Sequence, residues 1–489
     1  LQKRQARLMI VAKKNDRDTE KSVNIMSYSR AEERILCRKR AAHVLMEVAW
    51  LDHYHTTFLS IPMNVFKYIL VLALLSHSAC LSAQSTQDNW HQWRGPNNTG
   101  VSTTAIPPVK WSETENIQWK VAIDGNGSST PIVWGNRVFI LTAINTEIVD
   151  PKLPRPEDQP MRVFGIKHPN TLYQWVVICL DRETGDEQWR RTAVQRVPHE
   201  GHHGDNNYAS ASPVVADGKV YCWFGSAGLF VYELDGTPVW NRDLGKVYMG
   251  AALGEGCSPV VHGNRVIIVR DQQRQSSIEV LDTTNGKTIW KTDREEGNTW
   301  ATPAIAEYNG KVQVITCASN YVRSYDLENG DLIWKCSGLT GNATPCPIVE
   351  DNRVLVMTGY KGHSAMSLPI TETGDLSDSE KIFWTHDRGT PYVPSPVLLE
   401  GTLLFNQSNS GIWTALDSSS GKVVLERTRL PGIAKIYASP VVAQGHVYVT
   451  GIDGMTLILK PGNGLHVVAS NKLDDTFSSS AAIAGKQLF

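Results

Sequence analysis

The densest group of chemically capable side chains lies in residues 198–208, which read Pro-His-Glu-Gly-His-His-Gly-Asp-Asn-Asn-Tyr. Imidazoles and carboxylates in such numbers can bind zinc or another transition metal. The candidate ligands are His199, His202, His203 and Asp205. Their spacing matches no specific metal motif, and loops rich in Asn, Asp and Gly also form simply to satisfy backbone groups. A metal site and a structural loop are therefore both open interpretations.

Two further features could form a binding surface. Trp223, Trp300 and Trp413 lie outside the repeated motifs described below, and each could be a carbohydrate-stacking platform or part of the core. Residues 145–173 form a Pro-rich insertion that predicts a surface loop. Such a loop can shape the choice of partner or ligand, although it can equally be a simple connection.

Catalytic motifs are absent from the sequence. It contains no nucleophile elbow, P-loop, dinucleotide-binding fingerprint or zinc-protease motif. The cysteines of the later part of the chain are scattered in or beside predicted strands, at Cys179, Cys222, Cys257, Cys317, Cys336 and Cys346. They are interpreted as small buried hydrophobic residues, with at most one disulfide among them.

The elements that must position these residues follow from a repeat. A Ser or Thr followed by Pro, an apolar strand and a Gly turn recurs every 42 to 51 residues, after one longer interval of 82. Its copies are Thr130-Pro131, Ser212-Pro213, Ser258-Pro259, Thr302-Pro303, Thr344-Pro345, Ser395-Pro396 and Ser439-Pro440, with a weaker copy at Ser480-Ala481. The alternation of apolar and polar residues after each copy predicts short strands.

A second motif, Asp-x3-Gly-x3-Trp, closes several repeats. The full copies contain Asp181, Gly185 and Trp189; Asp282, Gly286 and Trp290; and Asp326, Gly330 and Trp334. Asp417 and Gly421 keep this spacing with Leu425 in place of Trp, and a shortened copy runs from Asp235 to Trp240. The motif predicts a hairpin in which Gly takes the positive-φ position and Trp fills the space between neighbouring units.

Four short strands in roughly 45 residues are the dimensions of a β-propeller blade. Residues 116–489 are long enough for eight blades. Residues 116–123, with Trp119, look like an isolated fourth strand, and the last unit begins at Ser478 and stops within its second strand. The N-terminal strand should therefore complete the eighth blade and remove an exposed edge. That blade lacks a third strand, which predicts truncation at the C-terminus.

The first part of the chain has a different character. Residues 63–83 combine Lys67 with an apolar run at 68–75 and a small-residue end, the pattern of a secretory signal peptide. Cleavage is expected after Ala83, and Cys80 leaves lipidation open. We therefore assign residues 84–115 to a leader segment and residues 116–489 to the propeller.

Residues 1–62 contain 12 basic and 7 acidic residues, and we interpret them as a spurious or disordered N-terminal extension. A cytoplasmic tail before a membrane anchor is the alternative. The whole chain has 48 basic and 49 acidic residues, whereas the expected mature chain has a net charge of −7. This charge argues against a nucleic-acid partner. The sequence thus predicts an exported periplasmic or envelope protein.

The repeat resembles the pyrroloquinoline quinone (PQQ) repeat family, which includes quinoprotein alcohol dehydrogenases and the outer-membrane assembly factor BamB. The clearest matches are Val-Leu-Asp-Thr-Thr-Asn-Gly-Lys-Thr-Ile-Trp at 280–290 and Tyr-Asp-Leu-Glu-Asn-Gly-Asp-Leu-Ile-Trp at 325–334. The leader Trp-Arg-Gly-Pro-Asn-Asn-Thr-Gly at 93–100 is similar to that of exported bacterial PQQ-like proteins. The resemblance implies an eight-bladed propeller and is weak for function, because the matching residues are architectural.

The dehydrogenases of this family imply PQQ beside a disulfide of adjacent cysteines, together with calcium and an Asp base. The sequence has no adjacent cysteines and no recognisable Asp-base motif. We therefore expect no cofactor and predict a monomeric, non-enzymatic binding or scaffolding protein of the bacterial envelope. Its expected partner is an envelope protein or a polysaccharide. A PQQ-dependent oxidoreductase and a glycan-binding propeller are the alternatives.

Overall fold

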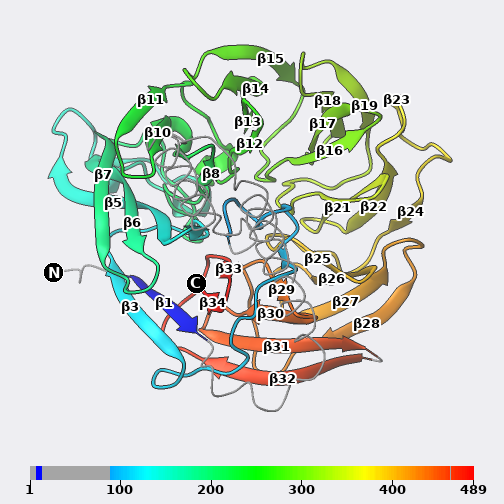
Figure 1. Ribbon diagram of the computed structural model, residues 1–489. Helices are drawn as coiled ribbons and strands as arrows, with labels where there is room; N and C mark the ends of the chain where they lie inside the picture. Colours follow the sequence, from blue (N-terminus) through cyan, green and yellow to red (C-terminus); the bar gives the residue numbers. More distant parts are fainter. Residues whose placement is uncertain (1–6, 14–88, 463) are drawn as a thin grey trace, which may run out of the picture. The chain divides into compact units, whose positions relative to one another are not determined.

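The computed structural model describes residues 7–13, 89–462 and 464–489. The predicted signal peptide, with Cys80 and the cleavage position, lies outside these residues. The described part is all-β, and its strands form eight sheets arranged around a central channel (Figure 1). The predicted eight-bladed β-propeller is therefore confirmed. Within the described ranges, no helix is long and apolar enough to cross a membrane.

Each of the first four blades is an antiparallel sheet built from four strands that follow one another in the chain. The first blade contains β4 (Ile132–Trp134), β5 (Arg137–Val149), β6 (Thr171–Asp181) and β7 (Glu187–Arg196). The second contains β8 (Val214–Ala216), β9 (Lys219–Trp223), β10 (Leu229–Glu233) and β11 (Pro238–Arg242). The third contains β12 (Val260–His262), β13 (Arg265–Arg270), β14 (Ser276–Asp282) and β15 (Thr288–Arg294). The fourth contains β16 (Ala304–Tyr308), β17 (Lys311–Thr316), β18 (Val322–Asp326) and β19 (Leu332–Cys336), with β23 (Gly374–Asp375) added to its edge.

The next three blades repeat this order, and short 3-10 helices occur only in connections of the described chain. The fifth blade contains β20 (Ile348–Glu350), β21 (Arg353–Thr358), β22 (Ser364–Pro369) and β24 (Trp384–His386). The sixth contains β25 (Val397–Leu399), β26 (Thr402–Asn406), β27 (Ile412–Asp417) and β28 (Val423–Arg429). The seventh contains β29 (Val441–Ala443), β30 (His446–Thr450), β31 (Met455–Gly462) and β32 (Gly464–Lys472), with β2 (Val101–Ser102) on its inner edge. The 3-10 helices are η3 (Pro156–Asp158), η4 (Val163–Gly165), η5 (Gly225–Ala227) and η6 (Gly250–Ala252).

The eighth blade is assembled from three separate parts of the chain. Its strand order is β33 (Ile483–Ala484), β34 (Gln487–Leu488), β1 (Arg7–Lys13) and β3 (Ile117–Ile123). Thus β3 forms the predicted closing strand, and β1 lies in the third position that the sequence leaves empty. Residues 7–13 belong to the stretch interpreted as an extension outside the propeller, so the structure differs there. The buried side chains of Val11 and Ala12 join the core, and the strand pairs with both β3 and β34.

The recurring Ser/Thr-Pro motif forms a hydrogen-bonded ring around the channel. In six of the eight blades the hydroxyl at this position accepts the N–H of the equivalent residue in the preceding blade, at 2.8–3.0 Å, and these hydroxyls belong to Ser212, Ser258, Thr302, Ser395, Ser439 and Ser480. The Thr130 hydroxyl instead donates to the Ser480 carbonyl at 3.1 Å. In the fifth blade the equivalent residue is Cys346, whose N–H donates to Ser395 at 3.0 Å. The sequence interpretation placed this copy at Thr344-Pro345, two residues early, because the segment contains two consecutive X-Pro pairs.

Tryptophans join neighbouring blades on the outer side of the ring. Each of five indole N–H groups donates to a carbonyl in the hairpin turn of the next blade, from Trp119, Trp189, Trp240, Trp290 and Trp384. Each ring also packs on a turn glycine, where an added Cβ would approach it to 2.5–2.7 Å, at Gly185, Gly236, Gly286, Gly330 and Gly421. Trp334 is fully buried, but its indole N–H finds no acceptor among the described residues. The structure assigns Trp384, outside the predicted motif, to the glycine of the sixth blade.

The leader segment crosses the centre of the ring, where Figure 1 shows it in blue. Trp90 exchanges two backbone hydrogen bonds of 2.9 Å with Val133 of the first blade. The buried guanidinium of Arg94 donates to the carbonyls of Pro440 and Pro396, both at 2.6 Å, in the seventh and sixth blades. The leader thus connects the first blade with the sixth and seventh blades, which lie on the other side of the eighth blade that closes the ring.

Candidate functional site

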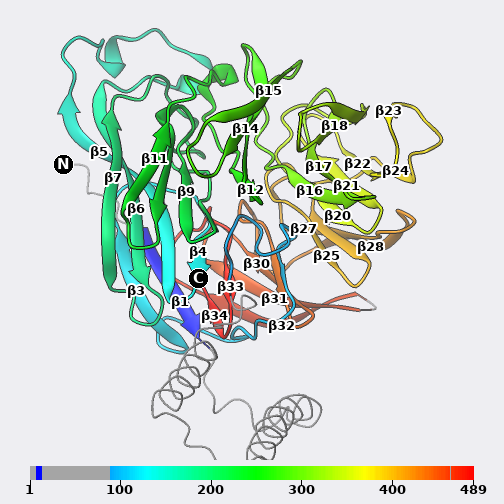
Figure 2. The same ribbon diagram turned by 45° about the horizontal axis from the view of Figure 1, so that its top comes forward.

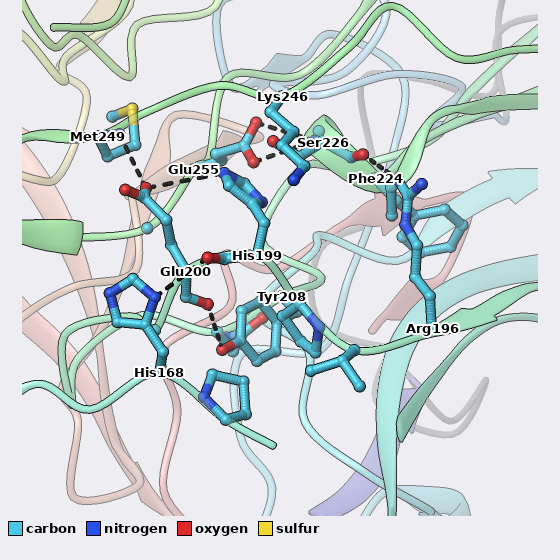
Figure 3. Close-up of a pocket in the computed structure, with 18 of the residues that line it drawn as sticks. His168, Arg196, His199, Glu200, Tyr208, Phe224, Ser226, Lys246, Met249 and Glu255 are labelled. Atoms are coloured by element: carbon cyan, nitrogen blue, oxygen red, sulfur yellow. Dashed lines mark hydrogen bonds and ion pairs between the residues drawn. The ribbon is translucent and has the colours of Figure 1, made fainter. Parts of the chain in front are cut away.

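Loops that enter the innermost strands gather on one face of the ring and enclose two adjoining cavities. The first cavity, of about 640 Å³, lies between the first two blades and the insertion 145–173 (Figure 3). The second, of about 400 Å³, lies at the mouth of the central channel and is lined by residues from loops of all eight blades. Residues 198–208 separate them, because His199 and Glu200 line the first cavity while His203 and Asp205 line the second.

The four predicted metal ligands do not converge. His199 Nε2 donates to the Val247 carbonyl at 2.8 Å, and His202 Nδ1 donates to the His203 carbonyl at 2.8 Å. His203 Nδ1 lies 3.7 Å from Asp205 Oδ2 on the channel side. Within the described ranges, no three His, Cys, Asp or Glu side chains are grouped as metal ligands would be. Burial lowers the pKa of His199 and His202, so both are neutral at pH 7.

Two glutamates give the first cavity its unusual electrostatics. Both Glu255 oxygens accept the Ser226 N–H, at 3.0 and 3.1 Å, and Glu200 Oε2 accepts the Met249 N–H at 3.1 Å. Burial raises the pKa of Glu255 to about 7 and also raises the pKa of Glu200. Among the described residues, no Lys or Arg forms an ion pair with either carboxyl group. Glu255 can therefore both donate and accept hydrogen bonds at neutral pH.

Local backbone geometry positions Glu255. It lies against the turn η5, whose first residue, Gly225, has φ of 58°. A Cβ on Gly225 would lie 2.3 Å from Glu255 Oε2, so only glycine allows the carboxylate to approach this turn. The turn N–H then becomes the donor that holds the carboxyl group at the cavity wall.

The insertion supplies the opposite wall of the first cavity. His168 Nδ1 donates to the His199 carbonyl at 3.1 Å, and the Tyr208 hydroxyl donates to the Glu200 carbonyl at 2.8 Å. Trp175 Nε1 donates to the Tyr208 carbonyl at 2.9 Å. The His168 bond holds the insertion on the polar loop 198–208, while the other two bonds brace the loop internally and against β6. Figure 3 shows the labelled side chains of both segments around one space.

The first cavity is suited to binding more than to nucleophilic catalysis. Cys257 lines it, but burial raises the pKa of its thiol, which keeps the sulfur protonated at neutral pH. Ser210 donates its hydroxyl to Asn206 Oδ1 at 2.6 Å, and the Ser226 hydroxyl accepts the Val247 N–H at 2.8 Å. Neither serine is hydrogen-bonded to a His in the described part of the chain, so neither has the base that nucleophilic attack requires.

Aromatic side chains surround the mouth of the channel. Trp93 of the leader lines it, with its indole N–H 3.1 Å from Cys346 Sγ. Tyr360 and Tyr392 are stacked, with ring centroids 4.8 Å apart and an interplanar angle of 28°. Tyr437 and Trp300 complete the set. The sequence reasoning found Trp300 and missed the tyrosines. Their position in the repeat could have identified them. Tyr392 and Tyr437 lie two or three residues before a Ser-Pro motif, which places them in loops that lead to the centre of the ring.

The three tryptophans suggested as stacking platforms have different environments. Trp413 is fully buried in the core between the sixth and seventh blades. Trp223 is also buried, although it contributes to the wall of the first cavity. Trp300 is only half-buried, and its Nε1 donates to the Gly254 carbonyl at 2.7 Å. Trp300 alone of the three thus presents a ring to the channel.

The channel mouth does not fit the quinone cofactor that the resemblance raised. PQQ carries several carboxylates, which require cationic side chains. The described residues that line this cavity include Asp205 and Glu255 but no Arg or Lys. The six described downstream cysteines are all free, so no disulfide is present in this part to cover a quinone ring.

Comparisons with known proteins agree with the architecture. A family model described as outer membrane protein assembly factor BamB matches residues 174–424 and 336–489. A solved europium-containing methanol dehydrogenase aligns with a TM-score of 0.54 at 10% identity, over 82% of this chain and 88% of that one. Quinohemoprotein alcohol dehydrogenase from Comamonas testosteroni aligns with a TM-score of 0.53 at 10% identity, over 83% and 77%. The two likenesses to solved structures show the fold alone, because both are at 10% identity. No curated protein matches the sequence.

Proposed function

Because the chain belongs to the PQQ-repeat propeller family whose model is described as outer membrane protein assembly factor BamB, we propose that it is an exported scaffolding protein of the bacterial cell envelope. In this role the ring binds a partner protein and performs no chemistry on it. A disc of eight short-stranded blades is a rigid support, and its loops are free to carry recognition. The proposed protein is monomeric and has no nucleic-acid partner, in keeping with its lack of basic excess.

The apolar surface of the insertion 145–173 is the observation that supports this proposal most directly. Met161 is 90% exposed, Val163 is 61% exposed and Phe164 is 64% exposed, and they are close neighbours in the chain. Figure 2 shows the insertion, in cyan, projecting beyond β7 at one face of the ring. Contiguous exposed apolar side chains on a soluble propeller domain are typical of a protein interaction site. We name Met161, Val163 and Phe164 the insertion tip.

Site-specific photo-crosslinking tests this role. A photoreactive phenylalanine analogue is placed at position 161 in the insertion tip, in the full chain expressed in a bacterium. The matched control places it at Val468, which is 42% exposed on the outer strand β32. We expect a discrete envelope protein, identified by mass spectrometry, to be captured from position 161 and not from position 468. The Val163→Asp substitution should weaken that capture without changing the melting temperature.

Two results would count against the scaffold. Equal capture from positions 161 and 468, or absence of the protein from the envelope and periplasmic fractions, contradicts the proposed role. Reconstitution with PQQ and calcium that produced dye-linked alcohol oxidation would instead support the oxidoreductase alternative.

A further inference from the structure

Five aromatic side chains gather around one small space at the channel mouth. Trp300, Tyr360, Tyr392 and Tyr437 line it from four different blades, and Trp93 lines it from the leader. All five are half-buried, so each ring is held in place and still reaches the cavity. Rigid aromatic faces of this kind bind ligands that present C–H groups on a flat side, at a low cost in side-chain entropy.

Hydrogen-bonding groups lie between these rings. Asn409 Oδ1 accepts the Val393 N–H at 3.0 Å, whereas its Nδ2 has no partner among the described residues. The Tyr360 hydroxyl likewise has no hydrogen bond to any described residue, although its ring stacks on Tyr392. These groups are available to a ligand that carries hydroxyl groups. An entirely apolar ligand would leave them unpaired, which would reduce its affinity.

The charges around the cavity favour a neutral ligand. Its lining contains two carboxylates, Asp205 and Glu255, and no Lys or Arg. Asp205 already accepts the Tyr437 hydroxyl and lies 3.7 Å from both His203 Nδ1 and Lys435 Nζ. Neither carboxylate is placed to attract an anion. Two lysines lie next to the cavity, with Lys361 Nζ 5.4 Å from the centroid of the Tyr360 ring and Lys435 Nζ 4.5 Å from that of Tyr437, but neither lines it. A phosphorylated or uronic-acid ligand inside the cavity would therefore meet no cationic lining residue to compensate its loss of hydration.

We propose that the channel mouth binds the end of a neutral polysaccharide, with Trp300 and the Tyr360–Tyr392 pair stacking on sugar rings and Asn409 hydrogen-bonding to their hydroxyls. The cavity volume of about 400 Å³ is within the range of small-molecule sites, so it can hold the end of a glycan chain and no more than a few sugar rings. This site goes beyond the proposed scaffold function, because its ligand and its stacking residues differ from those of the insertion tip, although Phe164 of the tip also lines the cavity.

Calorimetric titration of the purified full chain, which keeps strand β1 of the eighth blade, tests the inference. The probes are the neutral hexasaccharides maltohexaose, cellohexaose and xylohexaose, with hexagalacturonate as the anionic comparator. We expect at least one neutral probe to bind and the anionic one to bind at least about tenfold more weakly. Trp300→Ala and Tyr360→Ala should each reduce affinity for the bound probe by about tenfold or more, as loss of one stacking face implies.

Phe383→Ala is the matched control, because Phe383 is an aromatic residue that is 51% exposed and does not line the cavity. It should bind the probe as the parent protein does. Tyr360→Ala serves as the independent second variant, because Trp300→Ala also removes an indole hydrogen bond. Binding of hexagalacturonate alone, binding of no probe, or unchanged binding by Tyr360→Ala would overturn the inference. Partner capture from position 161 is measured separately, so either proposal can fail while the other stands.

Discussion

Glu255 is a single residue whose chemistry is set by its surroundings in space. In the sequence it is one glutamate between two glycines, at Gly254 and Gly256. In the folded chain it contributes to both cavities and accepts the N–H of Ser226, about thirty residues earlier. Burial raises its pKa to about 7, with nearby Glu200 acting in the same direction and Arg270 opposing it.

This pKa predicts a pH-dependent contribution to stability. The value of about 7 in the folded state lies above the ordinary 4.5, so folding favours the protonated form. The contribution of Glu255 is therefore fully present below pH 4.5 and is lost as the pH rises through 7. Its size is about 3 kcal/mol, from the shift between those values. Urea unfolding at pH 4.5 and 7.5 should show this loss in the parent protein and not in Glu255→Gln.

Other titrating groups do not obscure the comparison. His168 and His199 have lowered pKa values and contribute stability that is lost as the pH falls, the opposite direction. Both are present in the parent and the variant, so their effect cancels. Glu328→Gln, at a side chain that is 73% exposed, controls for removal of a surface charge. Parallel pH profiles for the parent and Glu255→Gln would show that the carboxyl group is not perturbed by folding.

At the scale of the element, the hairpin is the unit that joins one blade to the next. Its Asp accepts backbone N–H groups of the turn, as Asp181 Oδ1 does from Glu183 at 2.8 Å and Thr184 at 3.0 Å. Its glycine faces the Trp ring of the preceding blade. Trp290, for example, donates to the Leu327 carbonyl at 2.8 Å and covers Gly330. A motif that is local in sequence therefore also provides a contact between blades.

Gly330→Ala tests this contact against a control in the same blade. Gly330 and Gly310 both have φ near +75°, at 79° and 73°, so alanine is strained at either position. Only at Gly330 would the new Cβ meet a ring, 2.5 Å from Trp290, whereas nothing lies within 4 Å at Gly310. Gly310→Ala should cost about 1–2 kcal/mol from backbone strain. Gly330→Ala should lower the free energy of unfolding by about 1–3 kcal/mol more than Gly310→Ala does, because the new methyl group overpacks against the ring.

Chemical denaturation of both variants measures the two costs. Trp290→Ala should lower the free energy of unfolding by about 3–5 kcal/mol, because a large buried ring is removed. Equal losses for Gly330→Ala and Gly310→Ala would show that the ring adjusts freely and that the glycine is needed only for its φ angle.

At the scale of the whole molecule, the leader and the eighth blade make the ring continuous. The leader crosses the channel, where Arg94 contacts the sixth and seventh blades through Pro396 and Pro440. Burial lowers the pKa of Arg94 to about 10, although the group stays charged at neutral pH. The guanidinium also donates to the Thr99 carbonyl at 3.1 Å and packs directly on Gly100. One side chain thus joins the leader to two blades.

Arg94→Ala should destabilise the ring as a whole. The substitution leaves buried carbonyls at Pro396 and Pro440 without a donor, and we expect a loss of about 3 kcal/mol or more. Arg94→Lys should lose less stability than Arg94→Ala, because the ammonium keeps the positive charge. It should still be less stable than the parent protein, because an ammonium cannot donate to both carbonyls as the planar guanidinium does. Lys110→Ala, at an exposed leader position, is the control. Differential scanning calorimetry measures the shifts, and an Arg94→Ala melting temperature equal to that of Lys110→Ala would contradict this role.

The blade follows from local sequence, because the strands of each of the first seven blades lie close together in the chain and contact near neighbours. The fifth blade is the exception in detail, since β23 of the fourth sheet lies along the chain between its strands β22 and β24. Turn glycines such as Gly286 and Ser-Pro motifs such as Ser258-Pro259 act within one blade or on the adjacent one, so their period reveals the architecture. Only the tertiary structure decided which loops meet. Trp300, Tyr360 and Tyr437 come from separate blades, and no local pattern records that their loops converge.

The same distinction explains the missing strand of the eighth blade and the arrangement of the histidines in residues 198–208. The third strand of the eighth blade is supplied by residues 7–13, whose pairing with β34 joins parts of the chain more than 470 residues apart. The histidines of residues 198–208 do not come together in space, because neighbouring residues of this loop face two different cavities. Short-range hydrogen bonds and turn conformations are written into neighbouring residues. Ring closure and the chemistry at its centre depend on packing between distant blades, which the order of residues alone does not specify.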